Sequence, residues 1–162
     1  MTMRQHSVHF ALAGCRALIL CACLGIGYQA QAADTRPSPS AASAQAPIEK
    51  ARAAIARKDW SVAIRDLQVL VRTEPNNADA HNLLAFSLRN DGDLARSKVH
   101  YDEALRLDPN HKGAHEYIGE LYLKMKQPDN AQRHLLILER LCGGKDCEEY
   151  QDLARALAEY KP

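Results

Sequence analysis

Hydrophobic and small residues recur along this chain with a period of 34 residues, beginning near residue 47. Within each period, apolar positions three and four apart fall into two successive stretches, which is the spacing of amphipathic helices. Equivalent positions carry the same type of residue: small in Ala51, Ala85 and Gly119, small again in Ala63, Ser97 and Ala131, and large in Leu67, Tyr101 and Leu135. The pattern predicts helical hairpins that stack closely where the small residues lie.

Polar segments divide this pattern into units. Lys58-Asp59 and Gly92-Asp93 fall between the two helices of a hairpin, where short turns are expected. Pro109 cannot continue the helix before it, and Asn110 suits the N-cap of the helix that follows. The predicted units cover residues 44–77, 78–111 and 112–145.

A further amphipathic helix is predicted over residues 146–160. Asp146 suits its N-cap, and Glu149 lies three residues further on, as in a capping box. Apolar residues on one face would cover the end of the stack, while the other face is polar, as a terminal helix requires.

The runs at 95–110 and at 63–76 resemble the second helix and exit turn of a tetratricopeptide repeat, and the resemblance covers about residues 44 to 141. It implies an all-α fold: a right-handed stack of about three helix hairpins plus a C-terminal capping helix, an α-solenoid. Two positions depart from the family pattern, because Lys50 occupies an apolar position and Cys142-Gly143-Gly144 replaces the exit turn of the third unit.

The N-terminal segment has the features of an export signal. Arg4 and Arg16 precede a short apolar run, and Ala30-Gln31-Ala32 fits a signal-peptidase cleavage site. We therefore expect a signal peptide at 1–32, a flexible Pro/Ser/Ala linker at 33–46 and a repeat domain at 47–160 in the periplasm. An uncleaved membrane anchor and lipidation of Cys23 are the alternatives. The segment from Cys142 to Leu153 also resembles the tail of small exported bacterial tetratricopeptide proteins.

Charge and composition narrow the classes of partner. The 21 Lys and Arg nearly balance the 20 Asp and Glu, and aromatic residues make up only 6% of the chain. Neither favours binding of nucleic acid. A membrane contact is expected only if the N-terminal segment is uncleaved or lipidated. No phosphate-binding loop or nucleophile elbow is present, so we predict no catalytic residues, no cofactor and no enzyme activity.

Cys142 and Cys147 are the two cysteines that remain after the predicted cleavage. An even pair suits a disulfide in an oxidising compartment, and a bridge here would pin the last helix to the third unit. The alternative is a redox pair or half of a metal site. Catalytic thiol pairs usually have two intervening residues rather than four, so we favour the structural bridge.

The histidines follow the repeat. His81 and His115 occupy equivalent positions of successive units, as do His100 and His134. His111 and His115 could share a helical face, but further ligands at suitable spacing are missing, so we predict no metal site.

The resemblance implies that the first helix of each unit lines the concave side of the stack. The candidate peptide-binding groove consists of Asn82, Leu83, Phe86, Arg89, Tyr117 and Glu120. Phe86, Leu83 and Tyr117 are candidate anchors, with Arg89 and Asn82 for contacts to a backbone or a carboxylate. Phe86 and Leu83 could instead pack between units. The lining lacks the Lys- and Asn-rich set with which tetratricopeptide clamps hold C-terminal carboxylates.

We therefore expect a non-catalytic scaffold or adaptor that binds a protein or peptide partner in the periplasm. An envelope thiol or redox factor that uses Cys142 and Cys147 is the alternative. A purely architectural role, with dimerisation through the first helix, is a third possibility.

Overall fold

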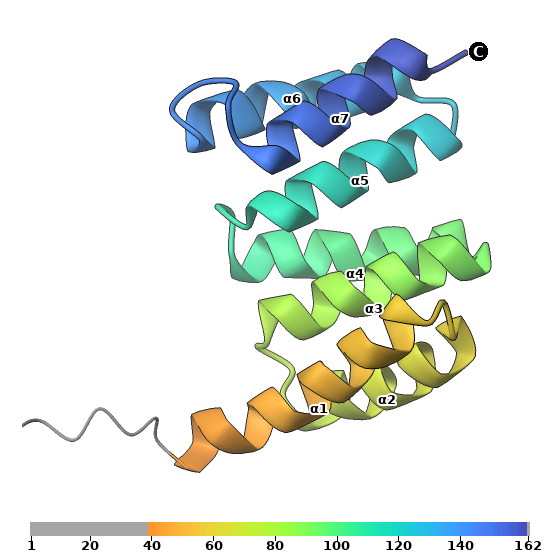
Figure 1. Ribbon diagram of the computed structural model, residues 1–162, viewed down its shortest axis with the longest axis vertical. Coiled ribbons are helices and arrows are strands. Elements are labelled where there is room, and N and C mark those ends of the chain that lie inside the picture. Colours follow the sequence, from red (N-terminus) through yellow and green to blue (C-terminus); the bar gives the residue numbers. More distant parts are fainter. Residues whose placement is uncertain (1–38, 162) are drawn as a thin grey trace, which may run out of the picture. The chain divides into compact units, whose positions relative to one another are not determined.

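The computed structural model describes the backbone of residues 39–161 and the side chains of residues 47–161. The predicted signal peptide at 1–32 and the first part of the predicted linker lie outside the described residues. Seven helices and no strand occur within them (Figure 1). The helices are α1 Pro39–Ala56, α2 Trp60–Thr73, α3 Ala78–Asp91, α4 Leu94–Leu107, α5 Lys112–Lys124, α6 Pro128–Leu141 and α7 Glu148–Glu159.

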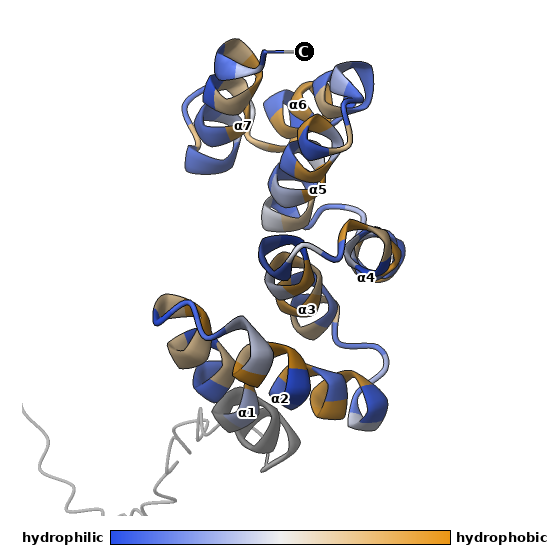
Figure 2. Ribbon diagram, turned by 90° about the vertical axis from the view of Figure 1, so that its right-hand side faces the viewer, coloured by the Kyte–Doolittle hydropathy of each residue, from blue (hydrophilic) through white to orange (hydrophobic). Residues whose placement is uncertain are grey.

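The predicted all-α stack is confirmed. Helices α1 and α2, α3 and α4, and α5 and α6 form three successive hairpins, and α7 packs on α5 and α6. Figure 2 shows α4 and α6 on the same side of α3 and α5, so the helices form two layers. The layer of α1, α3, α5 and α7 presents one face of the stack, which we call the inner face.

Helix α1 begins at Pro39, inside the segment predicted to be a linker. Proline is tolerated in the first turn of a helix, and the alanines at 41–46 favour helix formation. Pro47 lies within the helix, where it donates no backbone hydrogen bond. The segment from Pro39 onward therefore extends the first helix instead of forming a flexible tether.

The core follows the columns that the period predicts. Ala63, Leu67 and Leu84 are fully buried where α1, α2 and α3 meet. The next layer contains Ala85 and Tyr101, and the last is formed by α6 and α7. Small residues thus lie where helices approach, and larger ones fill the space beside them.

The three turns inside the hairpins share one backbone conformation. Lys58, Gly92 and Lys126 are spaced 34 residues apart and all have a positive φ. Glycine adopts this conformation without strain, whereas each lysine costs about 1 kcal/mol. Asp93 then caps α4 by accepting from the Arg96 amide, but Gln127 gives α6 no such bond.

Two predicted caps are wrong by one residue. His111, not Asn110, is the N-cap of α5, and its Nδ1 accepts from the Ala114 amide. Cys147, not Asp146, is the N-cap of α7, and its side chain makes no capping bond. In the second case the N-cap residue is held by the disulfide described below, and the predicted capping box of Asp146 and Glu149 does not form.

Gly119 allows α5 and α7 to approach each other closely. A β-carbon at this position would lie 2.5 and 2.7 Å from the two terminal methyl carbons of Leu153, which is fully buried on α7. Overpacking of this kind costs about 1–3 kcal/mol, which exceeds the gain of about 1 kcal/mol in helix propensity. We expect Gly119→Ala to lower the free energy of unfolding by about 1 kcal/mol in urea titrations.

Gly113 of the same helix is the matched control. Its added β-carbon would meet Asn82 and His111 at 3.6 Å, an ordinary contact. Gly113→Ala should therefore leave stability unchanged or raise it slightly, because it removes freedom from the unfolded chain. Equal effects of the two substitutions would contradict the close packing of α5 against α7.

Candidate functional site

A hollow opens on the inner face between α1, α3 and α5. Its volume is about 240 Å³. It is lined by Arg52, Ile55, Ala56, Leu83, Phe86 and Tyr117. We call this set the inner groove. Three of the six residues predicted for a groove, namely Leu83, Phe86 and Tyr117, therefore line the same hollow, and α1 contributes the other side.

An aromatic row forms the floor of the inner groove. The rings of Phe86 and Tyr117 have centroids 4.9 Å apart, and Trp60 meets Phe86 edge-on at 6.1 Å. Phe86 and Tyr117 remain partly exposed, whereas Leu83 is buried between helices. Leu83 is thus mainly a packing residue, and the two aromatic rings offer the accessible apolar surface.

Arg89, which is predicted to contact a ligand, is engaged by other residues of the fold. Its side chain is only 5% exposed, and it forms an ion pair with Glu120 on α5. The guanidinium also lies over the rings of Phe86 and Tyr117, at 5.3 and 5.6 Å from their centroids. Arg89 therefore links α3 to α5 through the ion pair, and its guanidinium stabilises the positions of the two aromatic rings. Its Nη1 is engaged within the fold, so a ligand carboxylate would have to compete with Glu120.

Asn82 is buried at the other end of α3, near the start of α5. Among the described residues nothing donates a hydrogen bond to its Oδ1 atom. A buried polar atom without a partner costs about 1–3 kcal/mol, so an unpartnered amide on the inner face is a candidate for pairing with a bound backbone.

Carboxylates gather on the inner face where α5 meets α7. Glu116 is only 7% exposed, and its neighbours include Glu120, Asp152 and Glu149. Burial and, to a smaller extent, the three nearby carboxylates together raise the pKa of Glu116 to about 8, and Arg89 opposes them. Burial also raises the pKa of Tyr117, next to this group. We call Glu116, Glu120, Glu149 and Asp152 the acidic pocket.

Sequence reasoning missed half of the acidic pocket. Glu116 and Glu120 lie on the helix predicted to line the inner face, but Glu149 was predicted to be part of a capping box and Asp152 falls on the predicted polar face of the last helix. The available signal was the regularity of the stack: α7 packs on α5 as the first helix of a next unit would, so its polar residues extend the inner face.

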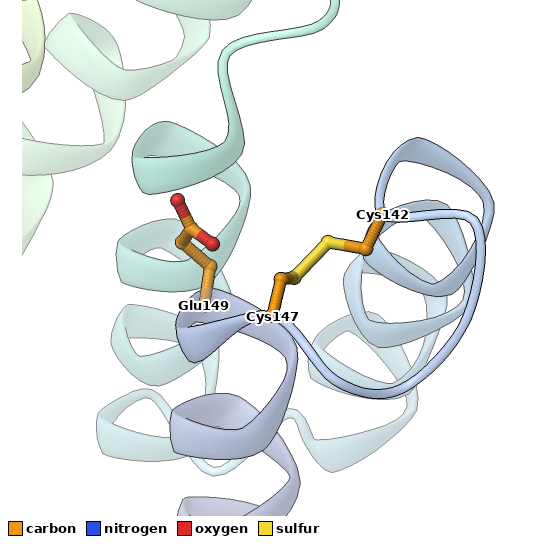
Figure 3. A group of neighbouring side chains, drawn as sticks. All are labelled: Cys142, Cys147 and Glu149. Atoms are coloured by element: carbon orange, nitrogen blue, oxygen red, sulfur yellow. A yellow bond between two sulfur atoms is a disulfide. The ribbon is translucent and has the colours of Figure 1, made fainter.

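Cys142 and Cys147 are joined by a disulfide, with their Cα atoms 5.9 Å apart (Figure 3). The bond links the C-cap residue of α6 to the N-cap residue of α7. Together with Glu149 they form a group close enough to hold a metal ion, within the described residues. Sulfurs bonded to each other are not thiolate ligands, however, so the oxidised pair leaves Glu149 alone.

The histidines form two equivalent pairs. The Nδ1 atoms of His81 and His100 lie 3.1 Å apart, and those of His115 and His134 lie 2.9 Å apart. The first member of each pair donates from Nε2 to the carbonyl of the proline six residues before it, at 3.1 and 3.0 Å. The pairs tie the two helices of a hairpin to the preceding turn.

His111 and His115 do not converge on a ligand. His111 uses Nδ1 as the cap of α5, and its Nε2 lies 3.2 Å from Asp79. His115 pairs with His134 as described above. The nitrogens of these two side chains are therefore engaged separately.

Comparison with known proteins identifies one repeat of the chain and its fold. Residues 78–111, which are α3 and α4 with their turns, match the family model for the tetratricopeptide repeat. The Sgt2 TPR domain from Aspergillus fumigatus superposes with a TM-score of 0.64 at 20% identity, covering 75% of this chain and 77% of that chain. Residues 78–111 therefore match a tetratricopeptide repeat, and the described part of the chain has the tetratricopeptide-repeat fold.

Other relatives share the same fold. The first TPR domain of Spaghetti (RPAP3), bound to the HSP90 peptide SRMEEVD, gives a TM-score of 0.61 at 16% identity and covers 72% of this chain and 94% of that chain. The TPR repeat-containing thioredoxin TTL4 of Arabidopsis thaliana is 28% identical over 109 residues, which are 67% of this chain but 15% of that protein. The chain therefore matches only a small part of the length of this curated relative.

No helix among the described residues is both long and apolar enough to span a bilayer.

Proposed function

We propose that this tetratricopeptide-repeat protein binds an extended segment of a protein partner along its inner face and performs no chemistry on it. The observation that carries the proposal is the open, aromatic-floored inner groove between α1, α3 and α5. Partly exposed aromatic rings give a partner residue a large contact area at low cost in entropy. The unpartnered Oδ1 of Asn82 adds a hydrogen-bond acceptor for a bound backbone.

Structural relatives support this class of function. The RPAP3 domain is described in complex with an HSP90 peptide, and another relative is the CopN–Scc3 complex. Both are protein associations on a similar helical stack. For this chain, a protein or peptide partner follows as a proposal from the shared architecture together with the inner groove.

Filling the inner groove tests the proposal without removing any packing. Ala56 is exposed and lines the hollow, so Ala56→Trp would occupy it. Ala53 is exposed on the same helix but does not line the hollow, so Ala53→Trp is the matched control. Proteins recovered from an extract of the source cells should be lost with the first variant and kept with the second. Equal recovery with both variants would remove the inner groove from the account.

The proposed location is the periplasm, reached by the predicted signal peptide at 1–32. The support is the sequence pattern alone: a basic start, a short apolar run and a small-residue exit. Mass spectrometry of the mature protein should give an N-terminus at Ala33. An intact Met1, or a lipid on Cys23, would replace this proposal with one of its alternatives.

The disulfide is proposed to be structural. In a loop this short, the chain-entropy estimate of its contribution is about 2 kcal/mol. Reduction, or Cys142→Ser with Cys147→Ser, should lower the free energy of unfolding by about that amount in urea titrations. Partner recovery should be unchanged, because both cysteines lie outside the inner groove.

The redox alternative makes a different prediction for the same pair. A thiol factor would exchange Cys142 and Cys147 with a dithiol such as reduced thioredoxin under native conditions. Thiol titration that finds the pair fully oxidised and inert would support the structural bridge. Rapid exchange coupled to reduction of an added disulfide substrate would support the redox factor.

A further inference from the structure

The chemistry of the proposed partner can be narrowed from the charges on the inner face. The acidic pocket adjoins the inner groove through Arg89, which pairs with Glu120 and lies 5.6 Å from the ring centroid of Tyr117, a residue that lines the hollow. Within this region, Arg89 of α3 forms an ion pair with Glu120 of α5. Asp152 pairs with Arg155 of its own helix at 2.7 Å.

Glu116 and Glu149 are the two side chains of this group without a partner among the described residues, and the buried one of the two is Glu116. It is more than nine-tenths buried, and no described residue donates a hydrogen bond to its carboxyl group. Its surroundings are Arg89 from α3, Glu120 from α5, and Glu149 and Asp152 from α7. A buried acid among like charges is costly when ionised, and the fold offers Glu116 no cation of its own.

We propose that the acidic pocket receives a lysine or arginine side chain of the partner segment while a neighbouring apolar residue of that segment occupies the inner groove. The inference rests on the proposed function and specifies the partner as a segment with adjacent basic and apolar residues. Ammonium and guanidinium groups carry several donors, so one such group can satisfy carboxylates on both α5 and α7.

A metal ion fits this pocket less well than an organic cation. Among the described residues, the group of acid, cysteine and histidine ligands gathered tightly enough for one ion is Cys142, Cys147 and Glu149. Glu116, Glu120 and Asp152 are not part of it, so their oxygens are spread more widely. A wider spread suits the length and multiple donors of an arginine or lysine side chain.

Binding of a basic residue should also be linked to protons. The pKa of Glu116 is raised to about 8, so this carboxyl group is mostly protonated at pH 7. A cation placed beside it lowers that pKa and drives the proton off. Binding at pH 7 should therefore release up to about one proton, and the amount should fall as the pH rises above 8.

The experiment uses the full chain and a phage-displayed library of random 12-residue peptides. Peptides are kept if they bind wild type and are lost with Ala56→Trp, which defines inner-groove binders. We expect these peptides to be enriched in Lys and Arg over Asp and Glu. For the tightest peptide, replacing its basic residue by norleucine should weaken binding about tenfold, measured by calorimetry.

Variants of the protein test which carboxylates are responsible for the preference for a basic residue. Glu116→Gln and Asp152→Asn should each reduce the preference for the basic peptide over its norleucine version several-fold. Glu139→Gln on α6, outside the acidic pocket, is the control and should change nothing. Calorimetry in two buffers of different ionisation enthalpy should show proton release with wild type and none with Glu116→Gln.

The outcomes separate this inference from the proposed function. If no peptide is lost with Ala56→Trp, the inner groove does not bind segments and both proposals fail. If inner-groove peptides show no basic preference, or if norleucine costs no affinity, this inference is overturned while the proposed function stands. A basic preference that Glu139→Gln removes as well would reflect overall charge and would also overturn the inference.

Discussion

Arg89→Ala is expected to lower the free energy of unfolding by about 2–3 kcal/mol. Removing one partner of a buried ion pair costs about 3–5 kcal/mol, and the partial exposure of Glu120, 29%, reduces that figure. The substitution would leave Glu120 beside Glu116 without a cation, and it would also remove the contacts with the two aromatic rings. A urea titration at pH 7 and low salt measures the loss.

A double-mutant cycle separates charge from packing. Arg89→Met keeps most of the side-chain stem, and Glu120→Gln keeps an acceptor without the charge, so their coupling reports the ion pair. The pair Arg106 and Glu103, on the exposed face of α4, is the control, with an expected coupling of 0–1 kcal/mol. A coupling for Arg89 and Glu120 no larger than that of the control would contradict their role as the link between α3 and α5.

Acidification from pH 7 to 4.5 is expected to destabilise the fold by about 3 kcal/mol through the two histidine pairs. Each first histidine donates from Nε2, so its Nδ1 is left to accept from the Nδ1–H of its partner. Such a pair is neutral, and a second proton would place two N–H groups against each other. Burial and the neighbouring His115 lower the pKa of His134 from 6.5 to about 4.

The direction in which stability changes with pH follows from the number of protons that the folded and unfolded chains bind. Burial lowers the pKa of His100 and His115 as well, so the unfolded chain binds more protons than the fold below pH 6.5. Stability is therefore full above about pH 7 and falls as the pH drops toward 4. Glu116 acts in the opposite direction, because its raised pKa favours the fold below pH 4.5 and the benefit is lost toward pH 8.

The measurement is the urea midpoint from pH 4.5 to 7.5 in a Glu116→Gln background, which removes the opposing group. Carboxylates with lowered pKa values, such as Glu103, titrate below this range. Replacing His100 and His134 with Gln keeps a polar side chain but removes two titrating groups, so the slope with pH should fall by about half or more. An unchanged slope would mean that the pairs are not the source of acid sensitivity.

The sequence was most informative where the repeat is strict. The period of 34 predicted the buried positions of Ala63, Leu67 and Tyr101 and the turns at 58 and 92, because stacking forces equivalent residues into equivalent surroundings. The same period paired His81 with His115, which indicated a structural rather than a ligand role. Local signals such as caps were less reliable, as Asn110 and Asp146 show.

The inner face was less predictable because it depends on contacts across units. Arg89 lies on the predicted column, but its engagement by Glu120 and by two aromatic rings depends on the distance and angle between α3 and α5. The acidic pocket depends on where α7 packs, and a polar helical face does not reveal whether it meets solvent or another helix. The period of the sequence identifies which face of a helix is turned inward. Which side chains meet between two helices is known only from the packed structure.

The most direct test of the central claim is site-specific photo-crosslinking in the source cells. Benzoylphenylalanine is placed at Phe86 on the floor of the inner groove or, as control, at Leu136, an apolar residue of α6 that is 52% exposed and outside the groove. The account predicts a discrete crosslinked partner from position 86 and none from position 136. A partner captured only from position 136, or equally from both, would contradict binding in the inner groove.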